Sequence, residues 1–476
     1  MARIFLIQIP RLDDKLTWGI KEAHRQFDEA GCDVRVVDYN HIVYDRYRQT
    51  DQWQDIEDYC VTKNNRIPKN DLIQLFAGCM TDVRETDIVI FSVFTVESRE
   101  FAQLLGEWLR KRFPQMLIGC GGQGVRRPGE YASQTEWGDW LLGTSLFDFM
   151  FIGHSDETVP EWVKNNFKPL GKIYKESKVF PKIGFLQEKF WDKKERYKDP
   201  LYKGTNFDLY KTDKIVPKLY FVQGCVKKCT FCDVHMIDNF VMQDPKDIIK
   251  EIDYYHNELG MDEISFADNT INSSNSQFIK LLQGMYDWMQ NNNIDLKWST
   301  AGFAVKPEHQ LSDEMFQLIT ATNGMLSVGF DHVSDTVLDH MRKLYKWADI
   351  ESFIHRADEN GVTIETGLWI TGYPTETEED FKEYEKLTKL YKTAGNSILS
   401  NGVQPCSIPA NSPLIDLVTI DWKQPDNWYN DIVDRNTRNK RADILTYDIQ
   451  QAKTQGKIYF DMRNKKRSEI RHRDPI

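Results

Sequence analysis

The sequence lacks any apolar run that approaches the ~20 residues needed to cross a membrane. Its first residues, "MARIFLIQIP", hold an apolar stretch that is too short for the core of a signal peptide, and charges follow it. The sequence also contains no internal repeat and no low-complexity segment. These absences argue against a membrane-spanning, secreted or fibrous protein, so we expect a cytoplasmic chain with two or three domains.

Net positive charge is also missing. The chain has 61 lysines and arginines against 72 acidic residues, a formal net charge of −11, which disfavours a broad nucleic-acid-binding face. The last fourteen residues, "RNKKRSEIRHRDPI", are basic and are the exception. We interpret them as a solvated tail, with a contact to phosphate or nucleic acid as the alternative.

Cysteine is scarce, with eight residues in 476, and its distribution is uneven. Cys225, Cys229 and Cys232 fall within the short stretch "GCVKKCTFC". In a reducing compartment, clustered thiols predict a metal site or catalysis rather than disulfides. Lys227 and Lys228 make the stretch too polar for a buried core, so the cysteines are not explained by packing.

The first half of the sequence alternates short apolar runs with helical patterns. The apolar character of these runs is continuous, which is typical of strands buried on both faces of a parallel sheet. We therefore predict a flavodoxin-like or Rossmann-like doubly wound α/β domain over residues 1–170. Residues 41–86 are too long for a simple connection and are expected to hold helices. The strands are expected at 3–9, 33–39, 87–94, 116–122 and 147–153.

A polar, lysine-rich stretch at 171–214 is interpreted as a linker, because a second alternation of strands and helices begins after it. Six βα units, without the last two of a full barrel, predict a partial (β/α)6 TIM-like barrel over 215–424. Residues 425–476 are a C-terminal extension with no pattern that we can assign. The six strands are expected at 218–224, 263–268, 295–302, 325–331, 363–372 and 397–404.

The cysteine cluster has two metal-binding interpretations. A zinc site would need His235 as its fourth ligand, but four ligands within eleven residues close only a small loop, unlike structural zinc sites. An iron–sulfur cluster on three thiolates would instead leave one iron open to a substrate or cofactor. The cysteines follow the first barrel strand, at the edge where such barrels place their chemistry, which favours the open cluster.

C-x3-C-x2-C after the first strand of a barrel resembles the motif of the radical S-adenosyl-L-methionine (SAM) superfamily. The resemblance implies a 4Fe-4S cluster on Cys225, Cys229 and Cys232, whose open iron chelates SAM. It also implies cleavage of SAM to a 5′-deoxyadenosyl radical, with an electron from a donor such as flavodoxin or ferredoxin. Phe231, before the third cysteine, would lie near the adenine.

Later segments are similar to one large branch of this superfamily. The similarity implies that Asp331, which replaces a family Glu, and the strand from Gly367 to Gly372 contact SAM. Lys343, or Arg342 before it, is a candidate to pair with a carboxylate. The matching segments are "SFADNTIN" (265–272), "VGFDHVSDTVLDHMRK" (328–343), "GLWITGYPTETEEDF" (367–381) and "QPCSIPANSPL" (404–414).

The second half also departs from the family pattern. "HVS" at 332–334 replaces the usual "SGS", and no "GGE" follows the second barrel strand. The contact to the amino group of SAM is therefore unassigned, and Asp268 at the end of that strand is a candidate for it.

Residues 1–165 resemble the cobalamin-binding domain that precedes the barrel in this branch. The similar segments include "GCDVRVVDYN" (31–40) and "MLIGCGGQGVRRPGEY" (116–131). Ser92 and Thr95 end the central strand at the switch point, where such sheets bind ligands. Gly121 and Gly122, at the next strand end, allow close approach of a large planar ligand. These four residues are the candidate cobalamin contacts.

The cobalamin expectation has one open point. The DxHxxG motif, whose His replaces the lower cobalt ligand, is absent, and the loop at 10–19 contains no His. This fits a radical enzyme whose cobalt has no protein imidazole below it, and it also fits a domain that has lost the cofactor. His41 and His154 are histidines outside that loop that could approach cobalt.

Three functions remain compatible with the sequence. We favour a cobalamin-dependent radical SAM methyltransferase that acts on an unactivated carbon. The alternatives are a radical SAM oxidation, cyclisation or rearrangement enzyme whose first domain binds no cobalamin, and a non-enzymatic metal-binding interaction protein. The substrate, whether a small molecule or a peptide, is not indicated, and we expect neither a membrane nor a nucleic acid as its partner.

Overall fold

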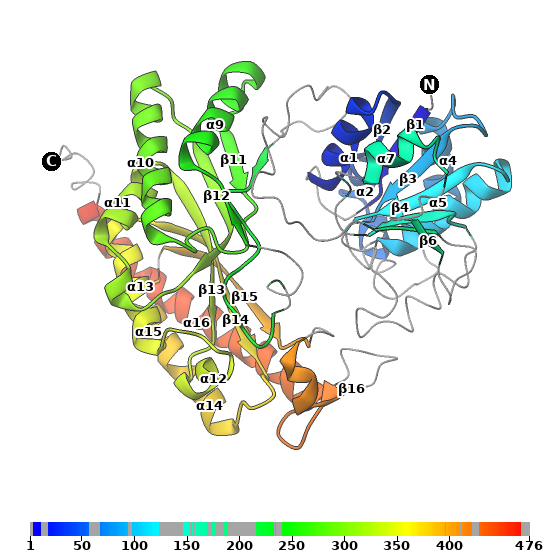
Figure 1. The fold of residues 1–476 in the computed structure, drawn as a ribbon. Coiled ribbons are helices and arrows are strands. Elements are labelled where there is room, and N and C mark those ends of the chain that lie inside the picture. Colours follow the sequence, from blue (N-terminus) through cyan, green and yellow to red (C-terminus); the bar gives the residue numbers. More distant parts are fainter. Residues whose placement is uncertain are drawn as a thin grey trace. The chain divides into compact units, whose positions relative to one another are not determined.

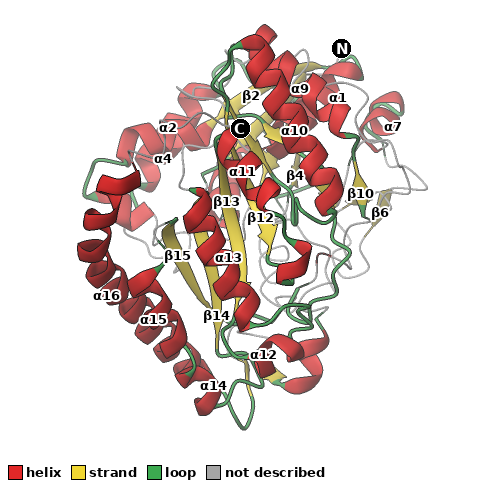
Figure 2. Ribbon diagram, turned by 90° about the vertical axis from the view of Figure 1, so that its left-hand side faces the viewer, coloured by secondary structure: helices red, strands yellow, loops and turns green. Residues whose placement is uncertain are grey.

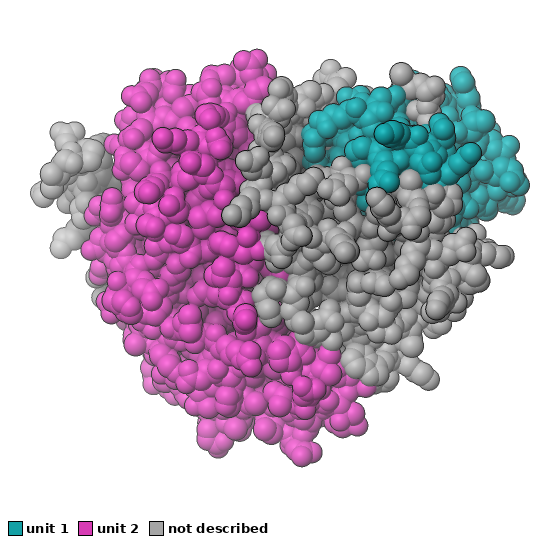
Figure 3. Space-filling model, viewed as in Figure 1, with its two compact units in different colours: residues 1–191, 199–216 teal, residues 192–198, 217–476 magenta. Residues whose placement is uncertain are grey.

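The computed structural model divides into two compact units, residues 1–191 with 199–216 and residues 192–198 with 217–476 (Figure 1, Figure 3). No helix in the described part of the chain has both the length and the apolar character needed to span a bilayer. The residues that the structure describes are 3–10, 18–56, 67–93, 98–122, 146–152, 155, 158–168, 174–176, 184–187, 216–232, 234, 240–395, 397–408, 412–420 and 428–467.

A seven-stranded sheet in the order β2-β1-β3-β4-β5-β7-β6 forms the centre of the first unit. All of its neighbouring strands are parallel except β6 and β7, which pair antiparallel. The order of β1 to β5 is that of flavodoxin-like folds, as predicted. The strands are β1 (Arg3–Gln8), β2 (Asp33–Asp38), β3 (Ile88–Ser92), β4 (Leu117–Gly121), β5 (Phe149–Ile152), β6 (Tyr174–Glu176) and β7 (Gly184–Gln187).

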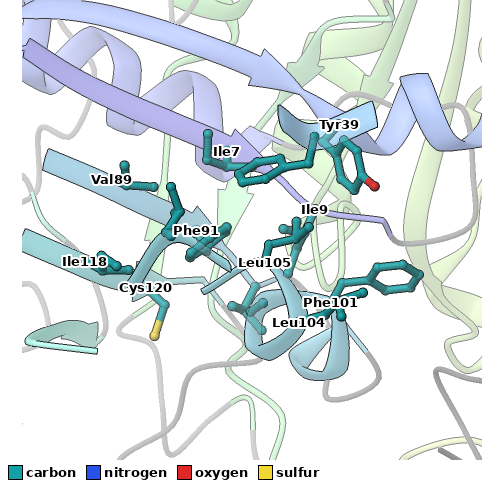
Figure 4. Packing of buried hydrophobic residues seen from close by; sticks show 14 of the residues in the cluster. Ile7, Ile9, Tyr39, Val89, Phe91, Phe101, Leu104, Leu105, Ile118 and Cys120 are labelled. Atoms are coloured by element: carbon teal, nitrogen blue, oxygen red, sulfur yellow. The ribbon is translucent and has the colours of Figure 1, made fainter. Parts of the chain in front are cut away.

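Helices cover both faces of this sheet, because successive strand residues point to opposite sides. Ile4 and Leu6 of β1 face one apolar core, which α1 and α7 complete. Phe5 and Ile7 face the other, with α2, α4 and α5 (Figure 4). The helices are α1 (Trp18–Glu29), α2 (Tyr39–Tyr47), α4 (Lys69–Cys79), α5 (Arg99–Arg112) and α7 (Thr158–Lys164), so α2 and α4 occupy the long insert as expected.

The expected linker is only partly a connection. β6 and β7 lie within residues 171–214 and extend the first sheet beyond β5. Residues 199–216 also belong to the first compact unit. Polar, lysine-rich composition therefore concealed two short strands, of which β6 is the edge strand of the sheet, where polar strands are tolerated.

The second unit contains a six-stranded parallel sheet in the order β15-β14-β13-β12-β11-β8. Each strand pairs with its predecessor, as in the predicted partial barrel. Helices α9, α10, α11 and α13 lie on the outer face (Figure 1, Figure 2). The strands are β8 (Lys218–Leu219), β11 (Glu263–Phe266), β12 (Lys297–Ala304), β13 (Gly324–Asp331), β14 (Thr363–Thr371) and β15 (Ile398–Pro405). The helices are α9 (Pro245–Leu259), α10 (Asn275–Asn292), α11 (Asp313–Ala321), α12 (Asp335–His340), α13 (Trp347–Asn360), α14 (Glu378–Lys382) and α15 (Glu385–Thr393).

The first barrel strand is shorter than predicted. Its pairing with β11 ends at Leu219, and the backbone N–H groups of Phe221 and Val222 donate to the carboxylate of Asp268. The chain then forms a separate antiparallel pair, β9 (Val222–Gln223) with β10 (Val241–Met242). Asp268 thus accepts backbone N–H groups that would otherwise pair within the sheet, and the chain leaves the sheet just before the cysteines.

The C-terminal extension belongs to the second unit. Its long helix α16 (Arg435–Arg467) contacts α15, β14 and β15. Arg438 and Arg441 on this helix are buried, with only 2% and 5% of their surface exposed. Between the barrel and α16 lie the 3₁₀ helix η3 (Pro413–Leu417) and the short strands β16 (Thr419–Ile420) and β17 (Trp428–Tyr429). The segment without an assignable pattern is therefore an integral layer of the barrel unit.

Candidate functional site

The cysteine loop lies after β9, next to the carboxyl ends of β8 and β11. Cys225, Cys229 and Cys232 are free thiols, Cys229 buried and the other two half-buried. The Sγ of Cys225 lies 3.6 Å from Oγ1 of Thr270 and accepts the N–H of Lys227 at 3.4 Å. A thiolate at Cys225 therefore has a hydroxyl and an amide as neighbours.

The three sulfurs are not gathered around a common point. Within the described residues, no three or more His, Cys, Asp or Glu side chains are grouped closely enough to hold a metal ion. Burial raises the pKa of the Cys229 thiol. His235, the alternative zinc ligand, lies outside the described residues. The donor set suits an iron–sulfur cluster in its chemistry, because three thiolates leave one iron open to a further ligand.

Thr230 anchors the cysteine loop to the rest of the barrel. Its hydroxyl donates to the carbonyl of His340 at 3.0 Å and lies 2.7 Å from the hydroxyl of Tyr373. Its N–H donates to the carbonyl of Met341 at 3.2 Å, and its carbonyl accepts the hydroxyl of Ser412. These contacts of Thr230, which lies between Cys229 and Cys232, hold the loop in place. The position of the loop backbone therefore does not depend on a bound metal alone.

Asp331 occupies the end of β13 in a left-handed backbone conformation, with φ at 66°. Such a conformation is uncommon for an aspartate and often marks a functional position. Its carboxylate pairs with Nζ of Lys343 at 2.6 Å and accepts the hydroxyl of Tyr345 at 2.6 Å. This ion pair fulfils the expectation that Lys343 or its neighbour pairs with a carboxylate.

Lys343 connects Asp331 with two residues of the cysteine loop. Burial lowers the pKa of Lys343, but the carboxylate of Asp331 and the sulfur of Cys229 raise it and prevail. The ammonium lies 4.9 Å from the centre of the Phe231 ring. The structure therefore brings together four sequence-predicted residues, Asp331, Lys343, Phe231 and Cys229.

Asp268 has a different position from the one expected. Its side chain is fully buried, and both carboxylate oxygens accept backbone N–H groups, from Phe221 and Val222. Burial raises its pKa to about 8, although the two N–H donors lower it. Asp268 thus anchors the start of the cysteine loop, and its fully buried carboxylate is not exposed to a ligand.

Gly367 and Gly372 make room for protein side chains. A Cβ on Gly367 would lie 2.9 Å from Cε2 of Phe330, on the helix-covered face of the sheet. A Cβ on Gly372 would lie 2.3 Å from Cγ of Arg438, and its φ is 66°. These positions are glycine because neighbouring side chains approach closely, and the expected SAM contact of the strand does not account for them.

A buried polar network at the ends of β13 and β14 was not predicted. Glu376 is fully buried, accepts the N–H of Gly372 at 2.6 Å, and pairs with Arg441 of α16 at 2.8 Å. His332 Nδ1 accepts the N–H of Ser334 at 2.9 Å, so the ring proton is on Nε2, 3.1 Å from Glu376. The replacement of "SGS" by "HVS" at 332–334 was the sequence signal that could have indicated this network. No sequence pattern indicated that Arg441 pairs with Glu376.

The candidate cobalamin edge of the first unit is described in part. Ser92 ends β3, is half-buried, and pairs in register with Gln8 and Gly121. Gly122 has φ at 110°, and a Cβ there would lie 2.4 Å from the carbonyl oxygen of Val93. Ser92 therefore lies at the switch point between β1 and β3, whereas Gly122 is explained by the neighbouring strand. Thr95 and His154 lie outside the described residues.

The barrel residues that carry this site match a known family. The sequence profile of the Radical SAM superfamily matches residues 219–388. The chain carries a radical SAM domain. The match begins in the first barrel strand and includes the cysteine loop, Asp331 and Glu376.

The radical SAM domain is also similar in sequence to curated proteins, among them a methylthiotransferase. The chain is 26% identical over 178 residues to the ribosomal protein uS12 methylthiotransferase RimO of Hydrogenobaculum sp. (strain Y04AAS1). This similarity covers 36% of the present chain and 43% of the relative, which is less than half of either protein.

Two solved structures share the fold across most of the chain. The radical SAM methyltransferase TsrM from Kitasatospora setae, with cobalamin and a [4Fe-4S] cluster bound, superposes with a TM-score of 0.58 at 13% identity. The superposition covers 87% of the present chain and 74% of TsrM. The cobalamin-dependent SAM radical enzyme OxsB has a TM-score of 0.56 at 11% identity, and covers 95% of the present chain and 56% of OxsB. The two-domain fold inferred from the sequence is thereby confirmed.

Proposed function

We propose that this protein is a cobalamin-dependent radical SAM methyltransferase. The observation that carries the proposal is the cysteine loop, with three free thiols at the strand ends of a radical SAM domain beside Asp331 and Lys343. The doubly wound first unit supports the cobalamin part, because the fold extends over both units in TsrM and OxsB.

Each residue of the barrel site has a role in this proposal. Cys225, Cys229 and Cys232 hold a 4Fe-4S cluster, which when bound supplies an electron to SAM. Thr270 and the N–H of Lys227 stabilise negative charge on the Cys225 sulfur. Hydrogen bonds to thiolate ligands orient them and adjust the reduction potential of a cluster.

SAM would lie against the cysteine loop after β9 and the end of β13. These are the segments to which the family resemblance assigns contacts with SAM. Phe231 offers a ring face for the adenine, and Asp331 offers carboxylate oxygens for a hydroxyl or amino group. Asp331 already binds Lys343 and Tyr345, so its orientation is set before SAM arrives. The backbone of the strand from Gly367 to Gly372 completes the proposed contact set, although close side chains account for the missing Cβ of both glycines.

Cobalamin, which carries a methyl group, would bind at the strand ends of the first unit. Ser92 is the described residue at the switch point, and Thr95, Gly121 and Gly122 follow β3 and β4. The protein positions the cofactors and excludes water, and the cofactors supply the reactivity. We propose flavodoxin or ferredoxin as the electron donor.

Methylthio transfer is the second candidate, because the curated relative RimO is a methylthiotransferase. The two activities differ in whether a sulfur atom enters the product. The methyltransferase proposal rests on the fold shared with TsrM over both units, whereas the similarity to RimO covers 36% of the chain. Mass spectrometry of the product distinguishes them.

Anaerobic reconstitution with iron, sulfide and a corrin tests the proposal. The expected result is a brown cluster, 5′-deoxyadenosine formed from SAM under a chemical reductant, and tightly bound corrin. Deoxyadenosine without bound corrin would instead support oxidation, cyclisation or rearrangement. Absence of SAM cleavage in protein with a full cluster would leave a metal-binding interaction protein.

A further inference from the structure

Lys306 is a buried lysine at the mouth of the barrel that the proposed chemistry does not use. It follows β12 by two residues, at the same edge as the cysteine loop, and only 7% of its surface is exposed. A lysine at this depth is uncommon, since its charge is normally paired when it leaves water. Its environment therefore needs an explanation.

The contacts of Lys306 are all to neutral oxygens. Nζ donates to the carbonyl of Ser273 at 3.3 Å and to Oδ1 of Asn275 at 2.8 Å. An ammonium has three N–H donors, so these bonds leave one donor for another acceptor. Among the described residues, no carboxylate forms an ion pair with Lys306, in contrast to Lys343, which pairs with Asp331.

A second positive charge lies close to Lys306 from the cysteine loop. Burial and, to a smaller extent, the charge of Lys227 together lower the pKa of Lys306 to about 8. The Lys227 side chain is half-buried and has no described acidic partner within ion-pair distance. Asp331 acts on Lys227 only from beyond ion-pair distance. Two ammonium groups near each other, neither in an ion pair with a described acid, create a positive potential that an anion would relieve.

The segment that carries the Lys306 acceptors is held to the end of β12 by hydrogen bonds. Asn272 is fully buried, donates to the carbonyl of Ala304 at 2.8 Å, and accepts the N–H of the same residue at 2.9 Å. These bonds clamp the loop after β11 to the end of β12. Ser273 and Asn275 therefore direct the Lys306 ammonium before any ligand binds, as a preformed binding group requires.

We infer that Lys306 binds a carboxylate group at the edge of the cysteine loop, with the charge of Lys227 strengthening the attraction. The carboxylate belongs either to SAM or to the methyl-accepting substrate, and this assignment rests on the proposed function. A charge-assisted hydrogen bond to a carboxylate supplies the partner that the third donor lacks. If the substrate provides the group, the acceptor is an amino acid, a peptide or another carboxylic acid.

Binding of acetate to the full chain tests the site without any cluster. In protein labelled with ¹³C at lysine Cε, the Lys306 signal is assigned as the one missing in Lys306→Arg. Acetate should shift this signal saturably and raise the pKa of Lys306, whereas equal chloride should not. Lys250 is the matched control, because it is exposed on α9 and already paired with Asp247 at 2.9 Å.

SAM binding identifies the source of the carboxylate. If SAM provides it, Lys306→Met should weaken SAM binding to reconstituted protein roughly ten- to a hundredfold, while decarboxylated SAM binds as before. If the substrate provides it, SAM affinity stays unchanged and acetate still shifts the Lys306 signal with SAM bound. Lys250→Met should change neither ligand.

The inference is overturned if acetate leaves the Lys306 signal unmoved, whatever the SAM affinity of Lys306→Met. A folding defect in Lys306→Met would not obscure this result, because the acetate titration uses the wild-type chain. Failure of the proposed function is separate, since a chain that holds no cluster would still bind acetate at Lys306. Acetate binding is therefore the deciding measurement.

Discussion

At the scale of single residues, surroundings separate the cysteines of the loop from the others. Cys225 has hydrogen-bond donors beside its sulfur, whereas Cys32 and Cys120 lie in the two apolar cores of the first unit. Burial raises the pKa of the Cys406 thiol to about 12, so it stays protonated among apolar side chains. Cys406 is packed in an apolar cluster away from hydrogen-bond donors of the kind that flank Cys225, so we expect it to be structural.

Cys229→Ala should therefore abolish the brown absorbance of the cluster and all SAM cleavage. The cysteine supplies one of three protein ligands, and the loop has no fourth described donor to replace it. Iron content and absorbance of the reconstituted protein measure the outcome. Cys406→Ser and Cys32→Ala should keep the wild-type cluster, and a Cys229→Ala protein with full iron would place the cluster elsewhere.

Asp331→Asn should weaken SAM binding roughly ten- to a hundredfold while iron content stays at the wild-type level. The substitution keeps the shape of the side chain and one acceptor oxygen, but it removes the charge that pairs with Lys343 and that SAM would contact in the proposed site. Asp331→Ala is less informative, because it leaves Lys343 buried without its ion-pair partner and also reduces stability. Equal SAM affinity in Asp331→Asn and wild type would remove this residue from the site.

Asp268 should make stability depend on pH. Burial raises its pKa from 3.8 to about 8 in the fold. The folded chain then binds one more proton than the unfolded chain between these values. Its stabilising contribution is complete below about pH 4 and is lost as pH rises through 8, by at most about 1.4 kcal/mol per pH unit.

Urea unfolding between pH 5 and pH 8 measures this effect. The free energy of unfolding of the wild type should fall more steeply with pH than that of Asp268→Asn, which has no proton to lose. Parallel profiles for the two proteins would show that the Phe221 and Val222 N–H groups keep Asp268 ionised throughout this range.

At the scale of elements, α16 is fixed to the barrel by two buried arginines. Arg441 pairs with Glu376, and Arg438 donates to the carbonyl of Trp428 at 2.6 Å while its guanidinium lies 3.7 Å from that ring centre. Tyr373, whose N–H also reaches Glu376, contacts Thr230 of the cysteine loop. The extension is thus connected through hydrogen bonds to the residues between the cysteines.

Arg441→Met should destabilise the second unit by about 3–5 kcal/mol, because it leaves the Glu376 charge buried without its partner. Arg435→Met is a matched control, since that residue is exposed at the start of the same helix and should change stability little. Thermal or denaturant unfolding compares the two variants. Equal stability would mean that His332 and the backbone N–H groups suffice to hold the glutamate.

The sequence predicted the bounds of strands well where the strand is a long apolar run. It predicted them poorly where a side chain distant in the sequence determines where a strand ends. β13 and β14 lie within a residue or two of their expected ranges, because apolar runs bounded by turns specify buried strands. β8 ends early because Asp268, nearly fifty residues later, takes its backbone donors. The role of Gly372 was likewise hidden, since the residue that needs its missing Cβ is Arg438 on α16.

At the scale of the whole molecule, the chain combines two parallel-sheet units whose carboxyl edges each suit one kind of ligand. The radical SAM domain offers thiols and charged groups at its strand ends, whereas the first unit offers Ser92 and glycine-lined backbone. Parallel sheets bind ligands at this edge because all strand ends and helix starts meet there. Methyl transfer by the proposed route needs both units in one chain, whereas SAM cleavage needs the second alone.

The first unit should therefore bind cobalamin without a protein imidazole below the cobalt. The loop at 10–19 contains no His, and His41 at the start of α2 has its Nε2 engaged with Asp45 at 3.3 Å. Electron paramagnetic resonance of the cobalt(II) state should show no triplet splitting from a coordinated nitrogen. The buried Nδ1 of His41 has no hydrogen-bond partner in the structure, so His41 is tested together with His154. A triplet splitting that disappears in His154→Ala or in His41→Ala would identify an axial ligand and contradict this prediction. Failure of the wild-type chain to retain any corrin would rule out the methyltransferase itself, because the methyl carrier would then be missing while the cluster and SAM cleavage remained.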